Sequence, residues 1–238
     1  MSTTILEVRD VHKVYGGVRA LNGLSMSVTA GEIHCVVGPN GAGKSTFFKT
    51  LIGVERPTSG RVFYKGSDVT RLAAFRRARL GLSVKFQNVS AFGELTALQN
   101  LFVPLRRKHA KAEIPACASA VLKRVGLAGC EDIPVRQLSH GQQQWLSIGL
   151  SVAAEPDLLL LDEPAAGLSA EETVRTAELI RDLNRSGMTV IVIEHDMGFI
   201  RSLRARTSVL HYGRLFAQGG FDEIAADPEV RRIYLGAA

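Results

Sequence analysis

The sequence has little cysteine and no long hydrophobic run. Its three cysteines, Cys35, Cys117 and Cys130, are odd in number and lack the spacing of metal ligands, so we expect neither a disulfide framework nor a structural zinc site. No stretch approaches the roughly 20 apolar residues that a membrane-spanning helix needs. The N-terminus also lacks the basic start and apolar run of a secretory signal. These absences predict a protein of a reducing, cytoplasmic compartment.

The composition is otherwise that of a globular protein. Of the 238 residues, 46% are hydrophobic and 22% are charged, which excludes an intrinsically disordered chain. Lys and Arg number 29 against 23 Asp and Glu, a net charge of +6. This excess suits an anionic ligand, a nucleic acid or an anionic membrane surface, and it does not choose among them.

Two hydrophobic patterns predict the fold class. Near the N-terminus, Leu24, Met26 and Val28 alternate with polar residues, which is typical of an antiparallel strand with one buried face. Three later runs are apolar throughout, as in parallel strands covered on both faces: Ile33 to Val37, Leu158 to Leu161, and Thr189 to Ile193. Helical patterns follow or separate these runs, for example Lys44 to Ile52 and Glu171 to Leu183, so we expect an α/β fold.

The middle of the chain, residues 92–155, is rich in Ala, Leu, Lys and Arg and has no β-branched run. Pro134 and Pro156 punctuate it, since a proline tends to end the preceding helix. We therefore expect one domain in which residues 92–155 form a helical insertion. Residues 1–91 and 156–238 would then form the sheet core together with an antiparallel β part.

A glycine-rich segment predicts a phosphate site. Gly38 to Ser45 match G-x-x-x-x-G-K-[ST] directly after a strand and at the start of a helix. Glycines let backbone N–H groups converge on phosphate oxygens. Lys44 in the first helical turn is unfavourable against the helix dipole unless an anion lies there, and a β/γ-phosphate would supply it. Ser45 is expected to bind Mg²⁺.

Polar side chains also follow the two other apolar runs. Asp162 is expected to hold Mg²⁺ through water, and Glu163 to polarise the attacking water. Taken alone, the two carboxylates would equally suit a helix N-cap. His195 follows the run that ends at Ile193, and ligands of open α/β sheets bind at this strand edge. An ordinary surface histidine is the alternative for His195.

Three further candidates carry less weight. Gln87 lies where the sheet part gives way to the helical insertion, and its side chain would touch Mg²⁺ or the attacking water; alone, it reads as a solvated loop residue. Ser139 and Gln142 form an S-x-x-Q capping box. The box either simply begins a helix, or it marks a second helix N-terminus that faces an anion and reaches the phosphates of a partner. Tyr15 is either an adenine-stacking platform or an ordinary half-buried aromatic residue.

Taken in their order along the chain, these candidate motifs and residues resemble those of the ATP-binding cassette (ABC) transporter ATPases. The resemblance covers nearly the whole chain. Gly38–Thr46 resembles their Walker A motif, Leu158–Glu163 their Walker B motif and Ser139–Gln142 their L-S-G-G-Q signature. Gln87, His195 and Tyr15 resemble the Q-loop glutamine, the switch histidine and the adenine-stacking aromatic. The resemblance implies a P-loop NTPase fold with a RecA-like parallel sheet.

The resemblance also implies a full set of site residues, with ATP and Mg²⁺ as ligands. The nucleotide-binding residues would be Tyr15, Gly38, Pro39, Asn40, Gly41, Ala42, Gly43, Lys44, Ser45, Thr46, Ser139, Gly141 and Gln142. The catalytic residues would be Glu163, His195 and Gln87, and the metal ligands Ser45, Gln87 and Asp162. Two such domains would close head to tail, with each ATP between one Walker A motif and the other subunit's signature.

The sequence departs from the family pattern twice. His140 replaces the usual second glycine of the signature, and Ser169 stands where many members have an aspartate. Finer similarity is to importers of the branched-chain amino acid and urea type. The resemblance implies the ATP-hydrolysing subunit of an importer, with branched-chain amino acids as the expected solute and urea as the alternative. The resemblance implies permease subunits as partners, a solute-binding protein that acts indirectly, and a peripheral location at the cytoplasmic face of the membrane.

Two rival functions are less favoured. A soluble ABC protein acting on nucleic acid or ribosomes usually carries long coiled-coil insertions or two fused cassettes, and this chain has neither. A small-molecule P-loop kinase would give Gln87 and the capped Ser139 helix no role. Two basic clusters are interpreted as solvated helix faces rather than a nucleic-acid surface, with anionic lipid as a third reading: Arg71, Arg76, Arg77 and Arg79, and Arg106, Arg107, Lys108 and Lys111.

Overall fold

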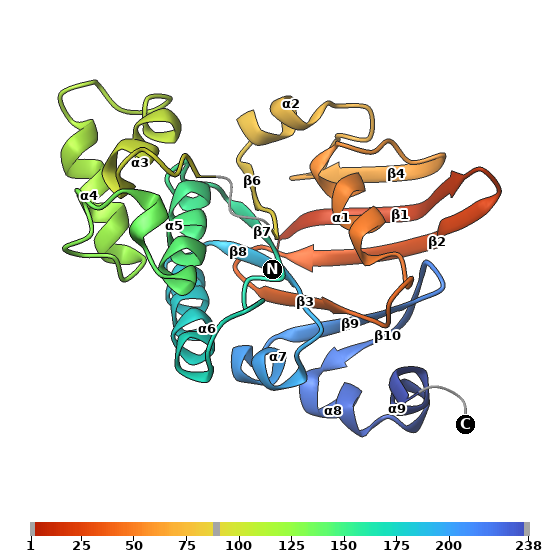
Figure 1. Ribbon diagram of the computed structural model, residues 1–238. Helices are drawn as coiled ribbons and strands as arrows, with labels where there is room; N and C mark the ends of the chain where they lie inside the picture. The colour runs from red at the N-terminus through yellow and green to blue at the C-terminus, as the bar shows by residue number, and fades with distance from the viewer. Residues whose placement is uncertain (1–2, 88–90, 236–238) are drawn as a thin grey trace.

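The computed structural model describes residues 3–87 and 91–235, which form two sheets and the helices around them (Figure 1). Two segments that resemble those of the importers, Phe86 to Val89 and Asp227 to Gly236, extend beyond the described residues, since Asn88, Val89 and Gly236 lie outside them. None of the helices in the described part of the chain combines the length and the apolar character that crossing a bilayer requires.

The smaller sheet is antiparallel and has the strand order β2-β1-β4-β5. Its strands are β1 (Thr4–Tyr15), β2 (Val18–Thr29), β4 (Ser59–Tyr64) and β5 (Ser67–Asp68). A two-residue turn joins β1 to β2, and its glycines Gly16 and Gly17 have φ of 49° and 94°. Tight hairpins need such positive φ values because they match the twist of the flanking strands. The alternating pattern near the N-terminus thus predicted this part of the fold correctly.

The larger sheet has six described strands in the order β10-β9-β3-β8-β7-β6. They are β3 (Ile33–Val37), β6 (Leu82–Lys85), β7 (Leu158–Asp162), β8 (Thr189–Ile193), β9 (Arg206–His211) and β10 (Arg214–Gly220). All neighbouring pairs are parallel except β9 and β10. The expected α/β fold with a parallel core sheet is confirmed, and the continuously apolar runs are its central strands.

Two hydrophobic clusters explain why these runs are continuous. Leu159 and Leu161 of β7 pack into one cluster, whereas Leu158 and Leu160 pack into the other. Because successive side chains of a strand point to opposite faces, a sheet with an apolar layer on each face needs apolar residues at every position. All four leucines have an exposed fraction of 0%.

Helices form the layers on both sides of the larger sheet (Figure 1). Helix α1 (Lys44–Ile52) contributes Phe47, Phe48 and Leu51 to the cluster shared with the antiparallel sheet. The opposite cluster contains residues of α6 (Ala170–Arg185) and α7 (Met197–Leu203). The chain is completed by α2 (Ala74–Arg79) before β6 and by α8 (Phe221–Ala226) and α9 (Pro228–Leu235) after β10.

Between β6 and β7 the chain forms helices α3 (Ala97–Leu105), α4 (Ile114–Arg124) and α5 (His140–Val152), with a short 3₁₀ turn at Val135–Gln137. They lie together at one side of the molecule, away from the antiparallel sheet (Figure 1). Trp145 of α5 is nearly buried and donates from Nε1 to Thr176 Oγ1 of α6 at 2.9 Å. This hydrogen bond connects the helical segment to a helix that covers the larger sheet.

The expectation of a solvated face was wrong for Arg77. Its side chain is 1% exposed, and its Nη1 donates to the carbonyl oxygens of Thr50 and Leu51 at 2.8 and 2.7 Å. Its Nε and Nη2 donate to two further carbonyls, those of Leu72 and Thr70. Burial lowers the pKa of Arg77 to about 10. Arg77 therefore donates to two carbonyls in the last turn of α1, where backbone acceptors lack partners within the helix. The Thr50 carbonyl also accepts from the Gly53 N–H at 3.3 Å.

Candidate nucleotide-binding site

Four neighbouring parallel strands deliver the predicted site residues to one sheet edge. In the order β3-β8-β7-β6, their carboxyl ends lead into the glycine-rich segment, His195, Glu163 and Gln87, respectively. Parallel strands end on the same side of a sheet, and their right-handed connections return along its faces. Segments far apart in the sequence are therefore neighbours here.

The glycine-rich segment after β3 is a tight loop whose glycines are sterically required. Gly38 has φ of 154° and Gly43 of 100°. A Cβ on Gly38 would overlap the carbonyl oxygen of Leu210, and one on Gly43 would overlap that of Ala20. The loop therefore runs too close to the neighbouring backbone for any side chain at these two positions.

The remaining loop residues surround the start of α1. Ala42 is buried, Pro39 is half-buried, and Asn40 and Gly41 are exposed. Lys44 Nζ donates to the carbonyl oxygens of Gly38 at 2.5 Å and Pro39 at 3.0 Å. Burial lowers the pKa of Lys44, although the nearby charges of Glu163 and Asp162 oppose this shift. A cationic amine, a helix N-terminus and an exposed Ser45 hydroxyl thus lie in one place, which fits a polyphosphate.

The predicted catalytic residues form one contact cluster. Gln87 Nε2 donates to Glu163 Oε2 at 2.6 Å, and His195 Nδ1 lies 3.5 Å from Glu163 Oε1. Glu163 has φ of 45°, which is a left-handed conformation. This conformation is energetically unfavourable for a residue that has a Cβ atom. Its backbone N–H donates to the carbonyl oxygen of Ile193 at 2.9 Å, which holds it in that conformation. The structure therefore brings together three residues that are distant in the sequence.

Asp162 is half-buried at the end of β7. Burial raises its pKa, and the charge of Glu163 adds to this, while Lys85 and Lys44 oppose the shift. A carboxylate, a serine hydroxyl and an amide oxygen are the oxygen donors that Mg²⁺ takes when substrate phosphates and water complete its shell. Asp162, Ser45 and Gln87 thus fit the chemistry of the metal ligands that the sequence predicted.

Tyr15 lies beside the phosphate loop. Its side chain is exposed, and Lys13 Nζ lies 4.7 Å from the centre of its ring. Burial raises the pKa of Tyr15, and the charge of Glu55 adds to this, while the charge of Lys13 lowers it. Tyr15 thus offers an exposed aromatic ring at the end of β1, which is the property that a stacking platform requires.

The signature segment starts α5 as the capping box predicts. Ser139 Oγ accepts from the Gln142 N–H at 3.2 Å, and Gln142 Oε1 accepts from the Ser139 N–H at 2.9 Å. Gly141 packs so closely on α6 that a Cβ would overlap the Glu172 carboxylate. Among the described residues, no hydrogen bond or ion pair connects Ser139, Gly141 or Gln142 to Lys44, Glu163 or His195.

Sequence reasoning missed two buried charged residues at the site. Lys85 is 1% exposed, its Nζ lies 3.5 Å from the Asp162 carbonyl oxygen, and burial lowers its pKa to about 8. Glu194 is also 1% exposed, and it accepts from the N–H groups of Ala165 and His195, both at 3.0 Å. Glu194 directly follows the apolar run that ends at Ile193, and this position was the available signal; Lys85 ends β6, whose sequence carries no such run.

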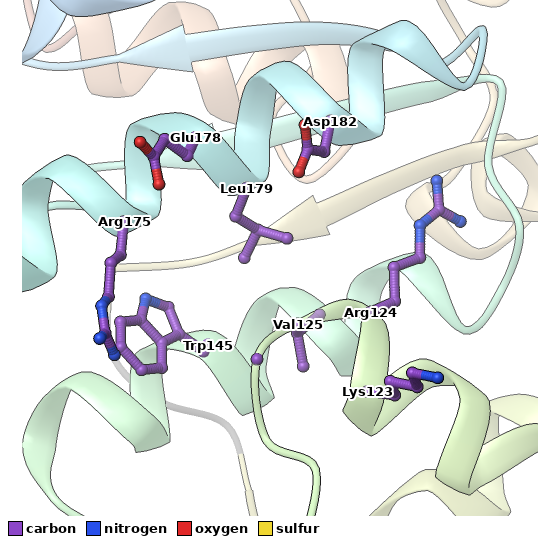
Figure 2. Close-up of a pocket in the computed structure, with 9 residues that line it drawn as sticks. Lys123, Arg124, Val125, Trp145, Arg175, Glu178, Leu179 and Asp182 are labelled. Carbon is purple, nitrogen blue, oxygen red and sulfur yellow. The ribbon is translucent and has the colours of Figure 1, made fainter.

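A separate pocket of about 300 Å³ lies between the helical segment and α6 (Figure 2). Trp145, Val125 and Leu179 supply its apolar wall, and charged side chains of both signs surround them (Figure 2). None of its lining residues is among the predicted site residues. The pocket marks the joint between α5 and α6 rather than the nucleotide site.

Comparison with known proteins assigns the family. The family model described as "ABC transporter" matches residues 21–166. The high-affinity branched-chain amino acid transport ATP-binding protein LivG of Salmonella typhimurium is 34% identical, with all of both chains covered. The corresponding protein BraF of Pseudomonas aeruginosa is also 34% identical with the same coverage.

Solved structures agree with this assignment. An ATP-binding cassette of an ABC transporter in its ADP conformation is 26% identical, has a TM-score of 0.90 and covers 99% of this chain and 100% of its own. A dimeric cassette in a post-hydrolysis state with ADP and Pi is also 26% identical, has a TM-score of 0.82 and covers 91% of this chain and 99% of its own. On its sequence, its fold and the geometry of its sheet edge, this chain belongs to the ABC transporter family.

Proposed function

We propose that the protein is the ATP-hydrolysing subunit of an importer for branched-chain amino acids. The observation that carries the ATPase assignment is the contact of Glu163 with both Gln87 and His195, next to a phosphate loop. A lone carboxylate after a strand has many uses. One that is held between an amide and an imidazole, beside Lys44, suits water activation at a phosphate.

In the proposed reaction, the Lys44 amine and the loop N–H groups bind the β- and γ-phosphates. Glu163 orients a water molecule and takes its proton as the oxygen attacks the γ-phosphorus. The bond to the β–γ bridging oxygen breaks, and ADP and phosphate leave. Bound Mg²⁺, held through Ser45, Gln87 and Asp162, would neutralise charge on the phosphate oxygens. His195, through its imidazole, would hold the γ-phosphate.

A second cassette completes the proposed site. Ser139, Gly141 and Gln142 form a helix N-terminus, which favours anions, yet their contacts lie away from Lys44 of the same chain. A head-to-tail dimer would bring this N-terminus to the partner's nucleotide, and one structural neighbour is a dimeric cassette. The second subunit can be the same chain or a paralogue. In either case it must supply a helix N-terminus equivalent to the one that begins after Ser139.

The solute assignment rests on the relatives. Those reported above are named for branched-chain amino acid transport and match over the full length. The alternative, a urea importer, is not better supported than branched-chain amino acid import. Permease subunits would hold the protein at the cytoplasmic face of the membrane, and a solute-binding protein would act through them. Nucleic acid is not a proposed partner.

Uptake of labelled leucine by cells with and without the gene tests the proposal. Loss of leucine uptake on deletion, restored by the wild-type gene and not by Glu163→Gln, would support it. Retained leucine uptake together with lost urea uptake would assign the urea branch instead. Release of phosphate by the purified chain without an acceptor separates the ATPase from a small-molecule kinase.

A further inference from the structure

The unusual signature residue His140 contacts the loop that follows Glu163 in the same chain. Its Nε2 lies 3.2 Å from the carbonyl oxygen of Ala166. A Cβ on Gly167 would lie 3.0 Å from the same nitrogen, so the imidazole packs directly on the loop. Because a carbonyl oxygen only accepts, Nε2 must carry the proton in this hydrogen bond.

The loop is thereby held from two sides. Glu194, which is 1% exposed and belongs to the sheet core, accepts from the Ala165 N–H at 3.0 Å. His140, on the first turn of α5, donates to the next residue's carbonyl. The loop begins at Glu163, whose N–H is fixed to β8. Only three peptide units therefore separate the proposed base from the atom that His140 holds.

We propose that His140 is a positioning residue that ties the signature of each chain to the loop after its own Glu163. This inference rests on the proposed function. In the dimer, Ser139 of one chain serves the partner's nucleotide, whereas Glu163 serves its own. A rigid tie between the two segments couples the two ATP sites, so that closure at one site positions the base of the other. The glycine that is usual at this position has no side chain to make the tie.

The neutral imidazole with its proton on Nε2 and the imidazolium both donate from Nε2. The tie therefore needs a donor at this reach and not a particular charge. This distinction selects the variants: His140→Gln keeps an N–H donor at a similar reach, and His140→Ala removes the donor while keeping a good helix former.

Hydrogen–deuterium exchange of the nucleotide-free chain tests the tie without hydrolysis or a dimer. Losing one hydrogen bond should speed exchange in the peptide covering 164–169 about fivefold in His140→Ala. His140→Gln should stay near wild type, and the buried peptide 189–193 should be unchanged in both. Equal exchange at 164–169 in wild type and His140→Ala would overturn the proposal.

The dependence of ATPase rate on ATP concentration tests the coupling. The Hill coefficient should fall toward that of independent sites in His140→Ala and be kept in His140→Gln. An unchanged Hill coefficient in His140→Ala, despite faster loop exchange, would overturn the coupling. A wild type that neither hydrolyses ATP nor dimerises with it would overturn the proposed function and the coupling with it, while the exchange result would still decide the tie.

Discussion

The sheet edge and the start of α5 are both built to meet anions, but they differ in what surrounds them. At the sheet edge, Lys44, Glu163 and His195 follow three different strands, and Glu163 after β7 contacts Gln87 after β6 and His195 after β8. At the start of α5, the residues that face outward are contiguous, and they satisfy one another in a capping box.

This difference separates chemistry from recognition. The sheet edge holds an amine, a carboxylate and an imidazole, which are groups that bind and activate. At the start of α5, Ser139, Gly141 and Gln142 offer only hydroxyl, amide and backbone N–H groups, which can bind an anion and cannot take a proton from water. The imidazole of His140 in the same turn contacts the carbonyl oxygen of Ala166. Changes at the edge should therefore alter ATP binding or hydrolysis by the chain that carries them, whereas loss of Ser139 should also weaken the pairing of two chains.

Glu163→Gln should have the largest effect. Removing the proposed base should lower the hydrolysis rate about 10²-fold or more, because general-base catalysis contributes on that scale. ATP affinity by calorimetry should remain, since the amide keeps its contacts with Gln87 and His195. Glu171→Gln is the matched control: its side chain is 78% exposed on α6, and among the described residues its one ion pair is with Arg175. Turnover near wild type in Glu163→Gln would remove Glu163 from its role.

Lys44→Ala should lower ATP affinity about 10- to 100-fold, since hydrogen bonds to charged groups contribute about 1.5–3 kcal/mol. Calorimetry on the single chain measures this loss. Lys49→Ala, at an exposed position in the last turn of the same helix, should leave the affinity unchanged. Equal affinities of Lys44→Ala and wild type would count against the phosphate-loop assignment.

Ser139→Ala should cost about 1 kcal/mol of unfolding free energy, the usual effect of losing an N-cap. Thr96→Ala is its matched control, because Thr96 caps α3 with the same kind of capping box. Denaturant unfolding should show similar losses for both. Only Ser139→Ala should weaken ATP-dependent dimerisation, measured by sedimentation. Equal weakening by the two variants would leave α5 with no role beyond stability.

Thr176→Val should have the smallest effect, a loss of stability at the contact between α5 and α6. It removes the acceptor of the Trp145 N–H at 2.9 Å. Thr176 is 0% exposed and valine fills the same volume, so the Trp145 N–H loses its acceptor; the expected loss of unfolding free energy is about 1 kcal/mol, with no effect on ATP hydrolysis. Tryptophan fluorescence and denaturant unfolding report it, with Thr176→Ser as the control that keeps the hydroxyl. An unfolding free energy equal to that of wild type would show that this hydrogen bond does not stabilise the contact between α5 and α6.

Local patterns predicted much of the fold. The continuous runs predicted β3, β7 and β8 because only a sheet covered on both faces needs apolar residues at every position. Strands β6, β9 and β10 and the short helices α2, α7, α8 and α9 carried no comparable pattern. The wrong reading of Arg77 has the same cause: its four carbonyl partners lie on segments up to 27 residues away, and no local charge pattern reports them.

The sequence by itself determined the chemical groups and their order, because phosphate loops, strand ends and helix caps are built from residues that are close along the chain. Tertiary structure alone decided which of these groups meet. Parallel pairing placed Gln87 and Glu163, 76 residues apart, at hydrogen-bond distance. The packing of α5 on α6 turned His140, an isolated departure from a motif, into a contact with Ala166. Such contacts depend on how elements pack, and that is a property of the whole chain rather than of any segment.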